Sequence, residues 1–242
     1  MDGDELLAEA HAIPLPWNDL LEDLPSGWEQ GFVRGMTSPE PPTTLMAIAI
    51  SVAPARQGQR LSGRMIEVFK DNARAAGLSS VIAPVRPTLK ERYPLTPIER
   101  YVEWRRDDGS HFDPWIRIHE RMGGEILAPA PESMTIRAPV ADWEKWTETR
   151  FPDDGEYVFP GGLAPLVVRR RGRRARRAER LGAAPVGVQS GRNTTPSATW
   201  MSPSRSREAT ASSSRSVAEV GFEAICRRAV ERRWRNEPSN EL

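Results

Sequence analysis

Residues 45–65 read LMAIAISVAPARQGQRLSGRM, and this stretch decides the fold of the 242-residue chain. Its first eight residues are apolar almost throughout rather than alternating with polar ones, which predicts a strand buried on both faces. From residue 61 to residue 76 the pattern changes to helical spacing, with one apolar face formed by Met65, Val68, Phe69 and Ala73. The sequence therefore predicts a strand, a tight turn and a helix in direct succession.

The turn between that strand and that helix reads QGQRLS over residues 57–62. A helix N-terminus leaves backbone amide hydrogens unpaired and carries a partial positive charge, so it attracts phosphate groups. Gly58 would let such a ligand lie directly against the backbone. An ordinary strand-to-helix connection has the same pattern, so both interpretations are open at this point.

The other elements follow from the same kind of pattern. Strands are predicted within residues 5–17, 78–85, 124–137 and 153–168. Helices are predicted at residues 28–35, 114–124 and 140–151. Between them, residues 86–111 form a long, irregular segment rich in charged and aromatic side chains. This order favours an α/β fold built around one mixed sheet that is flanked by helices.

The composition allows a sizeable core and gives no sign of a membrane protein. Hydrophobic residues make up 38% and charged residues 28% of the chain. The longest apolar run, residues 45–52, is far shorter than the roughly 20 residues of a membrane span. The N-terminus lacks the basic segment of a secretory signal, so we expect a cytoplasmic protein. The single cysteine, Cys226, excludes an internal disulfide, and no Cys/His cluster indicates a metal site.

Residues 50–85, ISVAPARQGQRLSGRMIEVFKDNARAAGLSSVIAPV, resemble the acetyl-coenzyme A motif of the GNAT acyltransferase superfamily. In that family a buried strand leads into an Arg/Gln-Gly-x-Gly-x-Gly/Ala turn and then into a helix. The resemblance implies that backbone amides of the turn hold the pyrophosphate of acetyl-coenzyme A, while Ile50 and Val52 pair with its pantetheine arm. The turn residues would be Gln57, Gly58, Gln59, Arg60, Leu61 and Ser62.

Two residues of this turn depart from the family pattern. Ser62 stands where glycine or alanine is usual, and its small side chain is compatible with a helix cap. Arg60 stands where the second glycine is usual. With a negative φ, the Arg60 guanidinium could meet a phosphate; with a positive φ, its Cβ would crowd the ligand.

The stretch FDPWIRIHERMGG, residues 112–124, resembles the fourth helix of the same family. The resemblance places Asp113 at the position of a coenzyme-binding asparagine. It places His119 at the tyrosine that usually protonates the departing thiolate. Histidine has a pKa near neutrality and could act as this general acid. Alternatively, His119 is a surface residue of an amphipathic helix.

The acceptor of the acyl group is less defined. The aromatic residues in and next to the long insertion are Tyr93, Tyr101, Trp104 and Trp115. They either line an acceptor pocket or pack the insertion against the rest of the domain. We favour packing for most of them. The strand at residues 45–52 carries no carboxylate that could act as a base, which leaves Glu9 and Glu103 as substitutes. The resemblance implies attack of a small-molecule amine on the acetyl thioester, helped mainly by positioning and a polarising strand amide.

The two ends of the chain differ from the family. The resemblance covers residues 2 to about 168, so we assign residues 1–168 to an incomplete GNAT-like domain. The family's first strand, two helices and second strand would precede Asp2, which predicts an exposed edge on the first strand. Residues 169–242 contain 17 Arg and 7 Glu but no Lys or Asp. We interpret this ending as the product of a frameshift in a GC-rich bacterial gene, mostly disordered, with a short helix at residues 217–235.

Three functions are compatible with these observations. The first is an acetyltransferase that uses acetyl-coenzyme A, and the second is a coenzyme-binding or inert fragment without catalysis. The third is a nucleic-acid-binding protein that uses the arginine run RRRGRRARRAER at residues 169–180. No aromatic residue interleaves this run, which argues against the third function. The oligomeric state is left open.

Overall fold

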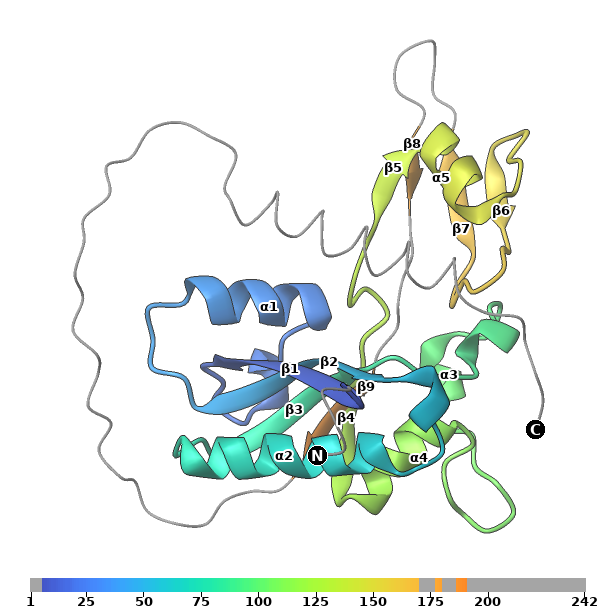
Figure 1. Ribbon diagram of the computed structural model, residues 1–242. Coiled ribbons are helices and arrows are strands. Elements are labelled where there is room, and N and C mark those ends of the chain that lie inside the picture. The colour runs from blue at the N-terminus through green and yellow to red at the C-terminus, as the bar shows by residue number, and fades with distance from the viewer. Residues whose placement is uncertain (1–5, 170–176, 180–185, 191–242) are drawn as a thin grey trace.

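A computed structural model describes residues 6–169, 177–179 and 186–190 of the chain. The main sheet has five strands in the order β1-β2-β3-β9-β4 (Figure 1). Its strands are β1 (Ala8–Leu15), β2 (Thr44–Val52), β3 (Ser80–Val85), β4 (Gly124–Pro129) and β9 (Val186–Ser190). The pair β2–β3 is parallel and every other pair is antiparallel, which confirms the mixed sheet.

Helices cover both faces of this sheet (Figure 1). One face carries α1 (Trp28–Thr37), and the other carries α2 (Leu61–Ala75) and α4 (Pro114–Arg121). Leu45 packs on the α2 side, whereas Met46, the next residue along β2, packs on the α1 side. Both faces of β2 are therefore covered near its start, which explains why its sequence is apolar without alternation.

The apolar face of α2 differs from the prediction. Val68 has 42% of its surface exposed, whereas Ile66 is buried together with Phe69 and Ala73. Met65 is only partly buried. The helix itself begins at Leu61 as predicted, so the error lies in the orientation of the face and not in the element.

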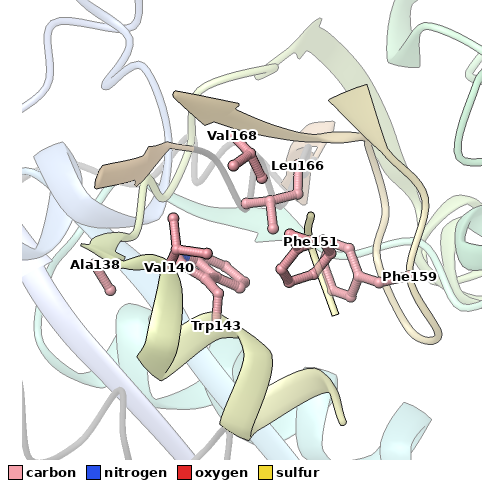
Figure 2. Packing of buried hydrophobic residues seen from close by; sticks show 7 residues of the cluster. All are labelled: Ala138, Val140, Trp143, Phe151, Phe159, Leu166 and Val168. Carbon is pink, nitrogen blue, oxygen red and sulfur yellow. The ribbon is translucent and has the colours of Figure 1, made fainter. Parts of the chain in front are cut away.

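A second sheet lies beside the first, so the prediction of a single sheet was wrong. It has four strands in the order β5-β8-β7-β6 and carries α5 (Val140–Thr147). Its strands are β5 (Arg137–Pro139), β6 (Gly155–Tyr157), β7 (Leu166–Arg169) and β8 (Arg177–Glu179). Large side chains from α5 and the following loops, among them Trp143, Phe151 and Phe159, form a separate core here (Figure 2). These aromatic residues bury enough surface to support the second sheet and α5 as a second lobe of the molecule.

The insertion after β3 contains η3 (Lys90–Arg92) and α3 (Ile98–Tyr101). Its aromatic rings contact one another edge-on or tilted, with centroid distances of 4.8 to 6.2 Å; they belong to Tyr93, Tyr101, Trp104 and Phe112. Tyr101 is completely buried. This confirms that the aromatic residues of the insertion pack it down; Trp115 lies on α4, against the same core.

Lys90 connects the insertion to the second lobe through hydrogen bonds. Its side chain is 1% exposed, and its Nζ donates to the carbonyls of Tyr93 and Leu163. Burial lowers the pKa of Lys90 to about 8. Arg86 makes a parallel connection by donating to the carbonyl of Gly161 at 3.2 Å.

Several predictions concern residues outside the described ranges. These are the helix at residues 217–235, Cys226, and most of the arginine run. Two short strands, β8 and β9, lie in the segment that the sequence analysis assigned to the tail. β1 is an outer strand of the described sheet, in line with the predicted edge. Among the described residues, none of the helices has the length and apolar character needed to cross a bilayer.

Candidate functional site

The site is organised by an opening between β2 and β3. The two strands pair only over residues 44–46 and 80–82. Beyond this point β2 continues along β1, while β3 continues along β9. No described strand pairs with the β3-facing side of β2 after Met46, so an extended ligand could form backbone hydrogen bonds there. Ile50 and Val52, predicted to pair with the pantetheine arm, lie on this part of β2.

A β-bulge interrupts β2 inside the opening. The pairing with β1 passes from His11 opposite Ala49 to Ala12 opposite Ala47, which leaves Ile48 as the extra residue. Trp28 Nε1 donates to the Ile48 carbonyl at 3.0 Å. A bulge turns backbone groups out of the regular ladder, so β2 changes its hydrogen-bond directions here.

The turn after β2 ends at a helix start without a side-chain cap. The short helix η2 (Pro54–Arg56) is followed by Gly58, with φ 77°, and by Arg60, the N-cap residue of α2. No side chain of the N-cap bonds to the first turn of α2. A Cβ added at Gly58 would meet no atom within 4 Å, so the space beside the turn is open. A helix start without a side-chain cap can bind an anion through its first-turn amides.

Arg60 adopts the less favourable of the two predicted conformations. Its φ is 60°, in the left-handed region. For a residue with a Cβ this conformation carries a strain of roughly 1–2 kcal/mol. The condition under which its guanidinium could meet a phosphate, a negative φ, is therefore not met, and the alternative in which its Cβ crowds the ligand applies. The exposed Arg60 and Arg64 side chains add positive charge at the beginning of α2.

Asp113 has a structural role, which corrects its prediction as a coenzyme-binding residue. It is completely buried and is the N-cap of α4, where its Oδ1 accepts from the amides of Trp115 at 2.9 Å and Ile116 at 3.3 Å. Its Oδ2 accepts from the Leu89 amide at 2.8 Å and the Tyr101 hydroxyl at 2.9 Å. Four donors within the protein occupy this carboxylate, which leaves it unavailable to a ligand.

His119 is neither a surface residue nor a general acid of the expected kind. Its side chain is 5% exposed and contacts the Trp115 ring edge-on at 4.6 Å between centroids. Burial lowers the pKa of His119 from 6.5 to about 4. At neutral pH the imidazole is therefore uncharged, and the argument from a near-neutral pKa was wrong. Its Nε2 is buried and has no hydrogen-bond partner among the described residues.

The two carboxylates predicted as substitute bases lie at the periphery. Glu9 is opposite Ser51 on β1, with its side chain 41% exposed and its Oε2 3.8 Å from His11 Nε2. Glu103 is exposed in the turn that follows α3. Neither carboxylate lies among the residues that line the cavity described next.

A cavity that the sequence did not predict lies where β2 and β3 separate. Its volume is about 130 Å³. The described residues that line it are Leu21, Leu24, Pro25, Ser26, Gly27, Met46, Ile82, Ala83, Pro84, Ala128, Pro129 and Ala130. They come from the segment before α1, from β2 and β3, and from the end of β4. No local pattern could have indicated it, because its walls are more than 100 residues apart in the chain.

Ser133 fixes the beginning of α1 beside this cavity. It is completely buried; its Oγ accepts from the Trp28 amide at 2.6 Å, and its carbonyl accepts from the Glu29 amide at 2.9 Å. A Cβ at Gly27 would overlap Ser133, so only glycine fits there. Trp28 and Phe32 stack at 5.2 Å between ring centroids. Together these contacts hold α1 over the same face of the sheet as the cavity.

No family model matches the sequence. A curated protein, "Arginine N-acetyltransferase avaD" from Aspergillus versicolor, is 33% identical over 157 residues. The match covers 60% of this chain and 53% of that protein, so the chain spans about half the length of this relative.

Two solved structures are similar in outline. The loading GNATL domain of CurA from Lyngbya majuscula has a TM-score of 0.49 and 16% identity, over 78% of this chain and 72% of that one. A GphF GNAT-like decarboxylase in complex with isobutyryl-CoA has a TM-score of 0.45 and 17% identity, over 55% of this chain and 67% of that one. At these values neither structure bears on the reaction of this chain.

Proposed function

We propose that the chain is a GNAT-like acyltransferase, and that it transfers an acyl group from an acyl-coenzyme A to the amine of a small molecule; acetyl-coenzyme A is the donor that the sequence resemblance implies. Identity of 33% with an N-acetyltransferase supports acyl transfer as the reaction class. The observation that carries the proposal is the uncapped N-terminus of α2 beside the opening between β2 and β3. A phosphate site and an unpaired strand side, joined by one short turn, suit the two halves of coenzyme A.

In this proposal the pyrophosphate of the donor binds to the first-turn amides of α2. The helix dipole and the positive charge of Arg64 favour the anion, whereas Arg60, with its positive φ, places a Cβ close to it. The pantetheine arm extends along the free side of β2, past Val52 and Ile50, towards the bulge at Ile48. The thioester would then lie close to the point where β2 and β3 separate.

The transfer itself is a nucleophilic substitution at the thioester carbonyl. The amine nitrogen attacks the carbonyl carbon, the C–N bond forms, and the C–S bond breaks. The amine loses one proton, and the departing thiolate takes up one proton. The neutral imidazole of His119 cannot supply that proton in the way an imidazolium would. Positioning of the two reactants and backbone dipoles near the bulge therefore provide most of the acceleration.

A charge placed in the first turn of α2 tests the donor site. Ser62→Asp introduces a carboxylate where the pyrophosphate would bind, while the helix dipole favours an acidic residue at that position. We expect coenzyme A to raise the Tm of the wild-type chain, because it binds the folded state, and to leave the Tm of Ser62→Asp unchanged. Ala141→Asp places the same charge in the first turn of α5 and serves as the matched control. Equal shifts in all three proteins would contradict the donor site.

A second candidate is a coenzyme-binding protein without catalysis. It is favoured by the absence of a carboxylate on β2 and by the neutral state of His119. A thiol-release assay with acetyl-coenzyme A and a panel of amines, arginine included, separates the two candidates. Binding without amine-dependent thiol release would support the second candidate.

A further inference from the structure

We infer that the acyl group carried by the donor is a short, uncharged aliphatic group larger than acetyl, and that the cavity beside Met46 and Ile82 binds it. This inference rests on the proposed function and specifies its substrate class. It follows from the position, the size and the lining of the cavity.

The cavity lies in line with the thioester. Met46 and Ile82 form the last residue pair before β2 and β3 separate, and both line the cavity. Ala83 and Pro84, the first residues of β3 beyond the paired region, also line it. A pantetheine arm that enters from the carboxyl ends of the strands points towards this vertex. The group attached to its sulfur is therefore the first part of the ligand to reach the cavity.

The cavity is larger than an acetyl group requires. Its volume is about 130 Å³. An apolar protein cavity of roughly 150 Å³ can hold a molecule of benzene. The single methyl group of an acetyl thioester would leave most of this space empty. An acyl chain of about four to five carbons fills more of this volume, and filling an apolar void restores dispersion contacts.

The lining selects against charge. Among the described lining residues there is no charged side chain, and Ser26 carries the one hydroxyl. A carboxylate placed against this lining would meet no cationic partner among the described residues, which is unfavourable. Acyl groups such as butyryl or isobutyryl therefore fit the lining, whereas malonyl and succinyl do not.

Isothermal titration of the full chain with a series of coenzyme A esters tests the inference without knowledge of the acceptor. We expect affinity to rise about fourfold for each methylene added between acetyl and butyryl. Succinyl-coenzyme A should bind no more tightly than coenzyme A. A series in which affinity does not change with chain length would overturn the inference.

A pair of matched truncations locates the effect in the cavity. Leu24→Ala enlarges the cavity, so the optimum should move by one or two carbons towards longer chains. Leu127→Ala removes the same side chain from the same apolar cluster but not from the lining, so the optimum should not move. Ala128→Leu narrows the cavity and should return the preference to acetyl. The same shift in Leu24→Ala and Leu127→Ala would overturn the assignment.

The failures of the two proposals are distinguishable. If no coenzyme A ester binds and Ser62→Asp changes nothing, the proposed function fails and this inference fails with it. If coenzyme A binds but chain length has no effect, only the inference fails. If Leu24→Ala then alters the preference among amines instead, the cavity belongs to the acceptor and not to the acyl group.

Discussion

Met46 of β2 and Ile82 of β3 lie opposite each other as the last pair before the two strands separate. On one side of this pair the sheet is continuous, and on the other side it opens towards the uncapped start of α2. The same two side chains form part of a cavity on the α1 face. One register position therefore connects the proposed phosphate site, the proposed path of the pantetheine and the cavity.

Replacing Arg60 by glycine should stabilise the protein. Glycine adopts the left-handed backbone of this position without steric strain, so Arg60→Gly should raise the free energy of unfolding by about 1 kcal/mol. Denaturant unfolding measures this change. Arg64→Gly, inside α2, is the control and should lower the free energy of unfolding by about 1 kcal/mol. Destabilisation by both variants would mean that Arg60 is not strained.

Replacing Asp113 should affect stability and not ligand binding. Asp113→Ala removes the cap of α4 and leaves two further donors, on Leu89 and Tyr101, without their acceptor. We expect a loss of about 2–4 kcal/mol in the free energy of unfolding. Titration with coenzyme A should give an unchanged Kd for the folded fraction. A large rise in Kd, measured where the variant is folded, would restore Asp113 as a ligand-binding residue.

His119 should make stability dependent on pH. Its pKa is lowered in the folded state, so below pH 6.5 the unfolded chain binds a proton that the folded chain does not. The free energy of unfolding should therefore fall as the pH drops from 6.5 to 4, by about 3 kcal/mol in total from this group. Unfolding of wild type and His119→Phe at pH 7 and pH 5 measures the effect by difference. Parallel pH dependence in both proteins would refute it.

Gly27 and Gly63 should respond to alanine in opposite directions. At Gly27 the added Cβ overlaps Ser133, so Gly27→Ala must displace the start of α1 and should cost about 2–3 kcal/mol of stability. At Gly63, inside α2, the nearest atom is Met122 Sδ at 3.7 Å, so Gly63→Ala should stabilise by about 1 kcal/mol. Thermal unfolding of both variants tests the pair. A neutral Gly27→Ala would show that α1 tolerates displacement.

Patterns within single elements were predicted well. The strand, turn and helix at residues 44–75 form as expected, and α1, α4 and α5 begin within one residue of their predicted starts. The errors concern relationships between elements. The second lobe was missed because hydrophobic periodicity shows that a strand is buried but not against which partner. Val68 was placed on the buried face of α2 because the exact direction of a helix face depends on the sheet beneath it.

The sequence by itself determined most elements up to residue 169, the turn at Gly58 and the family resemblance, because these depend on residues close together in the chain. It did not indicate β8 and β9, which form only by pairing with strands distant in the chain. Tertiary structure decided the chemistry of the site. The pKa of His119 and the occupation of Asp113 depend on the packing and the donors that other segments supply. The cavity exists because residues 21–27 meet residues 128–130 over the opening strands. Desolvation and enclosed space arise between segments distant in sequence, and only the folded chain brings those segments together.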